Sequence, residues 1–147
     1  MKTTKKISIF VLLFAGLMMP TIQSCKKYPD GPSISLRSRT ARVANSWRVE
    51  RYLKNGIDQT GNFIASKSNY VEIFTKENNW SFVYLNTSDG KIKSGGGTWH
   101  FINDDKQILR TEGGDNQLLH IMRLKQNEFW YYYMDGSDTK EFHLVSN

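Results

Sequence analysis

The distribution of apolar and polar residues divides the chain at about residue 45. Before that point lie an uncharged, largely apolar run from Ile7 to Pro20 and a short amphipathic stretch, 34–44, that predicts a helix. After it, short segments of alternating apolar and polar residues are separated by turns rich in Gly, Asn and Asp, which is typical of β-strands. The pattern therefore predicts one short helix followed by an all-β domain.

The β region contains eight such segments. They span residues 47–53, 70–74, 80–84, 98–102, 107–111, 118–124, 129–134 and 140–145. The two longest connections, 55–69 and 86–97, are predicted to be loops. Eight short strands joined mostly by tight turns suit an up-and-down barrel or a sandwich. Because closing the sheet removes its exposed edges, we predict an eight-stranded, up-and-down antiparallel barrel with a short N-terminal helix.

A different pattern marks the first 25 residues. Three lysines precede the apolar run, which is short for a transmembrane span, and small residues follow it, as in a secretory signal. The last four residues, Ile22-Gln23-Ser24-Cys25, resemble the lipobox of bacterial lipoproteins. That resemblance implies cleavage before Cys25 and fatty acylation of this residue, which would anchor the protein to a membrane of the bacterial cell envelope, with the outer membrane expected.

Cys25 is the only cysteine, so it cannot form an internal disulfide. The alternative to lipid attachment is an incidental thiol in an ordinary signal peptide or short membrane anchor. We predict three segments: a signal peptide at 1–24, a lipidated cysteine and Pro-containing tether at 25–33, and a barrel domain at 34–147. Several acyl chains would make the attachment permanent, because a single chain binds membranes only marginally.

Charge limits the range of partners. The chain carries a net charge of +6, but three of its lysines lie in the predicted signal and most of the remaining excess lies between residues 26 and 51. From residue 52 onward acidic residues slightly outnumber basic ones, so nucleic acid is not expected as a partner. The basic segment is either a solvated tether or a contact with an anionic membrane surface.

Short motifs resemble those of lipocalins. Asn45-Ser46-Trp47 opens the first strand in the manner of the lipocalin Gly-x-Trp, with Asn45 in place of glycine. Gly97-Thr98-Trp99, followed by Asp104-Asp105-Lys106, resembles a mid-chain element of small lipocalin-like bacterial lipoproteins. The resemblance covers residues 36–146 and implies a barrel with Trp47 buried at its closed end. No arginine occupies the last strand to stack on that tryptophan, and Lys140 is the nearest cation there.

The strands are rich in aromatic residues, which predicts a lumen filled by side chains or holding one small ligand. If a ligand binds, we expect it to enter the end opposite Trp47, between the segments 55–69 and 86–97, with Tyr70, Tyr84 and Trp99 as lining residues. The alternative is that all three are ordinary core residues. In the run from Trp130 to Tyr133, alternation predicts that one pair of rings faces outward, as a contact surface or beneath a covering segment.

Signals for chemistry are weak. The three histidines lie on separate, non-adjacent strands and show no metal-ligand spacing, and the glycines at 95–97 precede a strand rather than a helix. We therefore expect no catalytic residues, no metal, no cofactor and no enzymatic activity. Two functions remain: a lipoprotein that binds a small amphipathic molecule, or an envelope interaction or assembly module whose barrel is a scaffold for an envelope protein. An open cavity above about 300 Å³ would favour the first, and a packed lumen would favour the second.

Overall fold

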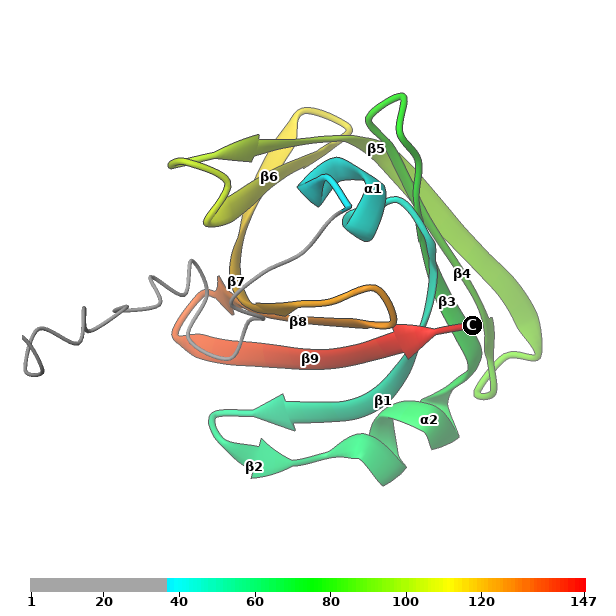
Figure 1. The fold of residues 1–147 in the computed structure, drawn as a ribbon. Helices are drawn as coiled ribbons and strands as arrows, with labels where there is room; N and C mark the ends of the chain where they lie inside the picture. Colours follow the sequence, from blue (N-terminus) through cyan, green and yellow to red (C-terminus); the bar gives the residue numbers. More distant parts are fainter. Residues whose placement is uncertain (1–36) are drawn as a thin grey trace, which may run out of the picture.

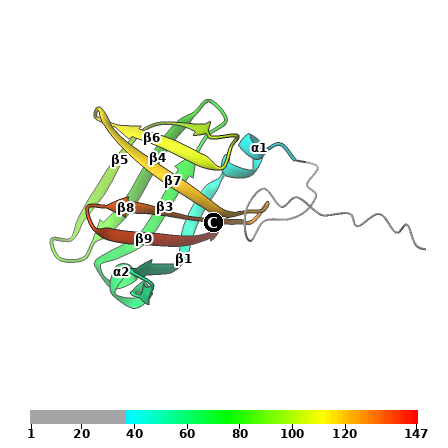
Figure 2. The same cartoon turned by 90° about the vertical axis from the view of Figure 1, so that its left-hand side faces the viewer.

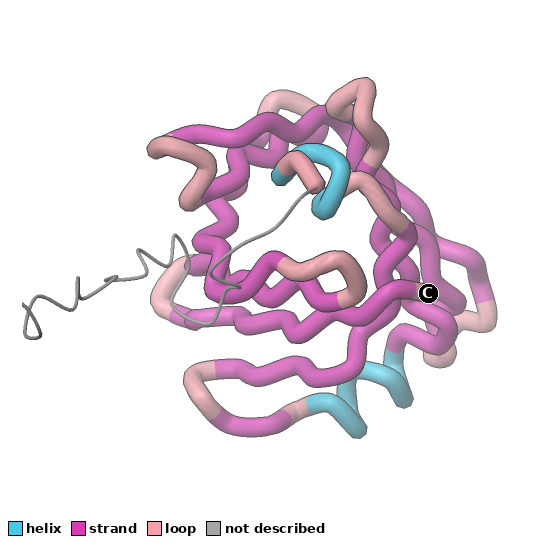
Figure 3. Tube along the Cα trace, in the orientation of Figure 1, coloured by secondary structure: helices cyan, strands magenta, loops and turns pink. Residues whose placement is uncertain are grey.

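Eight antiparallel strands close into a barrel in the computed structural model, which describes residues 37–147 (Figure 1). Each strand pairs with the next along the chain, and the last pairs with the first. The barrel strands are β1 (Ser46–Lys54), β3 (Lys67–Phe74), β4 (Asn79–Asn86), β5 (Lys91–Ile102), β6 (Gln107–Glu112), β7 (Asp115–Leu124), β8 (Glu128–Asp135) and β9 (Asp138–Ser146). The predicted up-and-down barrel is confirmed, and short turns join most of its strands (Figure 3).

The short helix α1 (Arg39–Val43) covers one end of the barrel (Figures 1 and 2). The Ser38 side chain caps the helix by accepting a hydrogen bond from the backbone N–H of Ala41, at 3.1 Å. Trp47 is fully buried, and its indole N–H donates to the carbonyl of Val43 at 2.8 Å. The predicted helix and the buried Trp47 at the closed end are therefore both confirmed.

The half of the lumen beneath α1 is an apolar core. Phe74 lies at its centre, edge-to-face with both Trp99 and Phe129, with ring centroids 5.7 Å apart in each pair. Aliphatic side chains from β6, β7 and β9 fill the remaining space, and four of them are completely buried: Ile108, Leu119, Leu124 and Leu144. An eight-stranded barrel is just wide enough to be filled by side chains in this way.

At the opposite end the barrel wall is split between β1 and β3. These strands pair only over Ser46–Arg48, whereas the far end of β1 pairs with the short strand β2 (Ile57–Asp58). The helix α2 (Thr60–Ser66) lies beside the opening (Figure 1), and its Phe63 packs on Tyr52 at 4.9 Å between ring centroids.

The prediction that 55–69 is a loop was therefore wrong. The segment contains β2 and α2, which are too short to show a periodic pattern of their own and are stabilised by tertiary contacts. One such contact is the hydrogen bond at 2.9 Å from the backbone N–H of Tyr52 to the hydroxyl of Thr60.

The prediction of a loop at 86–97 was also wrong. Only a turn at 87–90 separates the two strands, and the three glycines lie within β5, paired with β4. A side chain on Gly95 would collide with the Phe82 ring, and one on Gly97 with the backbone carbonyl of Thr111. Glycine is needed here because neighbouring groups approach the strand closely, not because the segment is a flexible loop.

We expect Trp47→Ala to lower the free energy of unfolding by about 3–5 kcal/mol, because it removes a large buried ring and the anchor of α1. Urea denaturation would measure the loss. Ile92→Ala is the matched control, since the Ile92 side chain is 74% exposed and its removal should change stability little. A loss below about 1 kcal/mol for Trp47→Ala would contradict its role in closing the barrel.

Candidate functional site

The structure brings together two of the three residues predicted to line a site. The rings of Tyr70 and Tyr84 lie 5.8 Å apart in the half of the barrel away from α1. Trp99 lies in the other half, against Phe74, with its side chain 1% exposed and its indole N–H donating to the Thr75 carbonyl. Tyr70 and Tyr84 therefore share one region, and Trp99 belongs to the core under α1, but none of the three is among the residues that line the open-end pocket described below.

A buried carboxylate lies near the middle of the lumen. Glu72 is 1% exposed and accepts hydrogen bonds from the hydroxyls of Tyr70, at 2.6 Å, and Tyr131, at 3.0 Å. The guanidinium of Arg110 donates to the same carboxylate at 3.3 Å and lies 3.9 Å from the centre of the Trp80 ring. Buried charges need partners of this kind. The carboxylate, the two hydroxyls and the guanidinium form one network, which separates the apolar core from the open half.

The electrostatics of this network keep its tyrosines protonated. Burial raises the pKa of the Tyr70 and Tyr131 hydroxyls well above the ordinary value, and the negative charge of Glu72 raises both further. Both hydroxyls therefore act as hydrogen-bond donors to Glu72 throughout the neutral range. The network of Glu72, Tyr70, Tyr131 and Arg110 therefore has the properties of a fixed structural layer, the floor of the open half, rather than of a proton-transfer site.

Our sequence reasoning missed Glu72 and Arg110. The signal that could have found them is alternation, because Glu72 shares a strand face with Tyr70 and Phe74, and Arg110 shares one with Ile108. A single charged residue on an otherwise apolar face predicts a buried polar group. That the two charges meet across 38 residues of sequence depends on strand register, which alternation does not supply.

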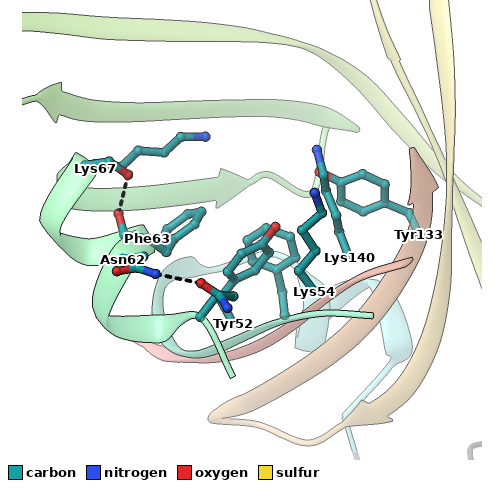
Figure 4. A pocket seen from close by; sticks show the side chains of 10 residues that line it. Tyr52, Lys54, Asn62, Phe63, Lys67, Tyr133 and Lys140 are labelled. Atoms are coloured by element: carbon teal, nitrogen blue, oxygen red, sulfur yellow. Dashed lines mark hydrogen bonds between the residues drawn. The ribbon is translucent and has the colours of Figure 1, made fainter. Parts of the chain in front are cut away.

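Above this floor, at the open end, α2 and the ends of β1, β8 and β9 enclose a pocket of about 290 Å³ (Figure 4). Its apolar walls are the rings of Tyr52, Phe63, Tyr133 and Phe142. Three ammonium groups also line it, those of Lys54, Lys67 and Lys140. The pocket thus combines flat apolar surfaces with positive charge.

The three lysines differ in their partners. Lys54 pairs with Asp138 at 2.7 Å, and Lys140 pairs with Asp135. The ammonium of Lys67 instead lies over the rings of its aromatic neighbours, 5.2 Å from the centres of both Phe63 and Tyr84, with no carboxylate of residues 37–147 within 4.0 Å. Burial, followed by the positive charge of Lys140, lowers the pKa of Lys67 below its ordinary value.

A second cavity, of about 310 Å³, lies at the same end on the side of β6, β7 and β8. Carboxylates dominate its rim, with Glu112, Asp115 and Asp135 around the buried Arg110. The open end therefore has a basic aromatic side and an acidic polar side, and the ion pair between Asp135 and Lys140 lies between them.

The aromatic run on β8 alternates as predicted. Tyr131 is fully buried in the lumen, and Trp130 lies on the other face of the strand. The Trp130 ring is stacked on His143, with centroids 4.1 Å apart, and the Arg123 guanidinium lies 4.4 Å from its centre. Neighbouring strands thus cover both faces of this ring, which leaves it a poor stacking platform for a ligand.

No model of a known protein family matches the chain, and no curated protein matches it significantly in sequence. In the described segment 37–147, neither helix is long and apolar enough to span a bilayer. The same residues contain no group of three or more His, Cys, Asp or Glu side chains that could hold a metal ion. Cys25 lies outside the described residues.

We expect Glu72→Leu to lower the free energy of unfolding by about 3–5 kcal/mol, because it leaves the Arg110 guanidinium buried without its counter-charge. The double variant Glu72→Leu with Arg110→Met should recover part of that loss, since it removes both charges together. Urea denaturation of the two variants measures the difference. A double variant as unstable as the sum of two independent single changes would show that the two charges are not coupled.

Proposed function

We propose that this protein is a membrane-anchored, lipocalin-like lipoprotein whose barrel binds a small amphipathic molecule at its open end. The observation that carries the proposal is the composition of the pocket there. Apolar rings line its walls, and the Lys67 ammonium at its edge lacks a carboxylate partner within residues 37–147. Binding sites for small molecules are typically concave and largely apolar, with a few polar groups that orient the ligand.

The packing of the lumen restricts any ligand to the open end. The half beneath α1 is filled by large buried rings, and the Glu72 network separates that half from the open end. The pocket volume, about 290 Å³, falls just below the value of about 300 Å³ that would favour ligand binding, and the packed lumen by itself favours the scaffold, so the proposal is supported by the composition of the pocket and not by its volume. A ligand of this protein is therefore small, or inserts only part of itself.

The proposed anchor is lipid on Cys25, which we place in the bacterial envelope, most simply at the outer membrane. The support is the basic, then apolar, then small-residue order of residues 1–25. The described part of the chain enters the barrel at the α1 end, whereas α2 lies toward the other end (Figure 2). Residues of α2 line the pocket, which therefore lies toward that end as well. A tether attached at α1 leaves the pocket accessible from the side away from the anchor.

An interaction module is the second candidate, and the outer surface of β4 and β5 favours it. Leu85 and Ile92 are opposite each other on this hairpin and are 37% and 74% exposed, with Val83 also 37% exposed two residues along β4. Exposed aliphatic groups that lie together mark contact surfaces for other proteins. If no amphipathic molecule binds at the open end, this envelope-protein scaffold becomes the favoured function.

Ligand binding can be tested by blocking the pocket. Ser66 lines it near the end of α2, so Ser66→Trp should fill it and abolish binding, whereas Ala65→Trp, at the adjacent exposed residue, should not. We would titrate the purified protein with hexanoate, hexylamine and hexanol and follow backbone amide shifts by NMR. Saturable shifts around Tyr52 and Tyr133 that disappear only in Ser66→Trp are expected. The absence of saturable shifts with all three compounds would contradict the proposal.

Anchoring can be tested in cells. We expect Cys25→Ser to leave an unprocessed or soluble protein, because serine cannot form the thioether through which the lipid is attached. Partition between detergent and aqueous phases measures the change, and Ser24→Ala, which keeps a small residue before the cysteine, should behave as the parent. Unchanged partition of Cys25→Ser would rule out the lipid anchor.

A further inference from the structure

We infer that the molecule bound at the open end is a small organic anion, a carboxylate or phosphate monoester on a compact apolar body, whose charged group pairs with the ammonium of Lys67. The inference rests on the proposed function and specifies the ligand of the same pocket. It follows from three features of the described residues: an uncompensated cation, the position of the acids, and the closed floor.

Lys67 is the uncompensated cation. Its ammonium is half-buried among aromatic rings, and the two other lysines of the pocket already have carboxylate partners in Asp138 and Asp135. Ring faces attract a cation, but they supply no full negative charge to balance it. An anion seated beside Lys67 would supply that charge as a charge-assisted hydrogen bond, which is stronger than one between neutral groups.

The surroundings of Lys67 also disfavour a cationic ligand. The charge of Lys140 is felt at Lys67, because it is among the causes that lower the Lys67 pKa. Glu72 opposes this effect and raises the Lys67 pKa, but its carboxylate is already paired with Arg110. Figure 4 shows the Lys67 chain extending over Phe63 toward the pocket, while Lys54 and Lys140 rise beside Tyr133. An anion between these side chains relieves the repulsion, whereas a second cation adds to it.

The acidic residues of the open end do not cancel this preference. Glu112 and Asp115 border the other cavity, next to Arg110, and neither lines the pocket that contains Lys67. Asp135 does reach toward the basic side, but it is paired there with Lys140. The basic side therefore keeps one positive charge in excess.

The floor limits the size of the ligand. Tyr131 and Glu72, which are 0% and 1% exposed, close the lumen below the open half, and packed rings fill the space beyond them. The aromatic walls around Lys67 accept a ring or a short chain, and a long acyl chain has no channel to enter. The structure thus favours a compact anion over a long-chain lipid.

Calorimetric titration of the purified protein with four six-carbon compounds tests the charge preference. Hexanoate and hexyl phosphate should bind at least about tenfold more tightly than hexylamine and hexanol, the factor expected from one charge-assisted hydrogen bond. The tighter of the two anions identifies the charged group. If hexylamine or hexanol binds as tightly as the anions, the inference is wrong while the proposed function stands. If none of the four binds, the proposed function fails with it.

Dodecanoate tests the size limit in the same titration. A lumen open to its longer chain would tighten binding on the order of a thousandfold over hexanoate, from the six additional buried methylenes. We expect a gain of less than about tenfold, because the floor leaves those methylenes in solvent. A gain near the larger value would overturn the compact-ligand part of the inference.

Substitution at Lys67 tests the assigned residue. Lys67→Met keeps the apolar length of the side chain and removes its charge, so hexanoate should bind at least about tenfold more weakly while hexanol binding is unchanged. Lys76→Met removes the same charge from an exposed turn at the α1 end and should leave hexanoate binding unchanged. Lys67→Arg keeps the charge and should retain binding. Equal hexanoate affinity in Lys67→Met and the parent would overturn the role of Lys67.

Discussion

The buried charge of Glu72 is the constraint on which the rest of the barrel depends. A carboxylate in the lumen is tolerable only because two tyrosine hydroxyls and Arg110 surround it, so three strands, β3, β6 and β8, must hold those groups in one place. The lumen toward α1 is then a packed, largely apolar core, and the half toward α2 is open and lined by aromatic rings together with charged groups. The network covers the apolar core on one side and forms the floor of the pocket on the other. One end of the barrel can therefore contribute stability while the other end contacts solvent.

Alternation along the sequence was sufficient to predict the eight barrel strands, though not β2 or the first part of β5, because each barrel strand buries one face and exposes the other. Their closure was predicted from the cost of exposed sheet edges. Alternation was not sufficient to predict position along the barrel axis. Trp99 was expected beside Tyr84, but the pairing of Gly97 with Trp80 sets the register of β5 and carries Trp99 to the α1 end. The glycines at 95–97 were assigned to a loop, whereas Gly97 lies in a strand where a neighbouring backbone carbonyl approaches too closely for a side chain. The face of the strand that a residue occupies follows from its neighbours in sequence. Its position along the barrel axis depends on strand register, which is set by residues far away in the sequence.

The same distinction explains why the end of the barrel that holds the candidate pocket was predicted but its lining was not, since Tyr70, Tyr84 and Trp99 are not among the residues that line it. Its rings come from β1, α2, β8 and β9, and the helix that supplies Phe63 is seven residues long, too short to leave a periodic signal. Lys67 stands where that helix ends and β3 begins, so sequence alone gives no reason to separate it from other surface lysines. Its distinctive property, a cation over rings rather than beside a carboxylate, exists only once α2 has folded against the strands.

The split between β1 and β3 converts a filled barrel into one with a pocket. Had β1 and β3 paired along their whole length, the wall would be continuous, and the ends of β1 and β9 would leave little room beside Tyr133. Instead β2 takes over the pairing of β1, and α2 occupies the opening, so that one wall is a helix whose side chains radiate rather than alternate. The helix brings Phe63 to this space, and Lys67, the first residue of β3 directly after the helix, reaches the same space. The departure from ideal barrel geometry thus occurs at the open end, where the core does not depend on it, and it is there that the chain leaves a positive charge uncompensated.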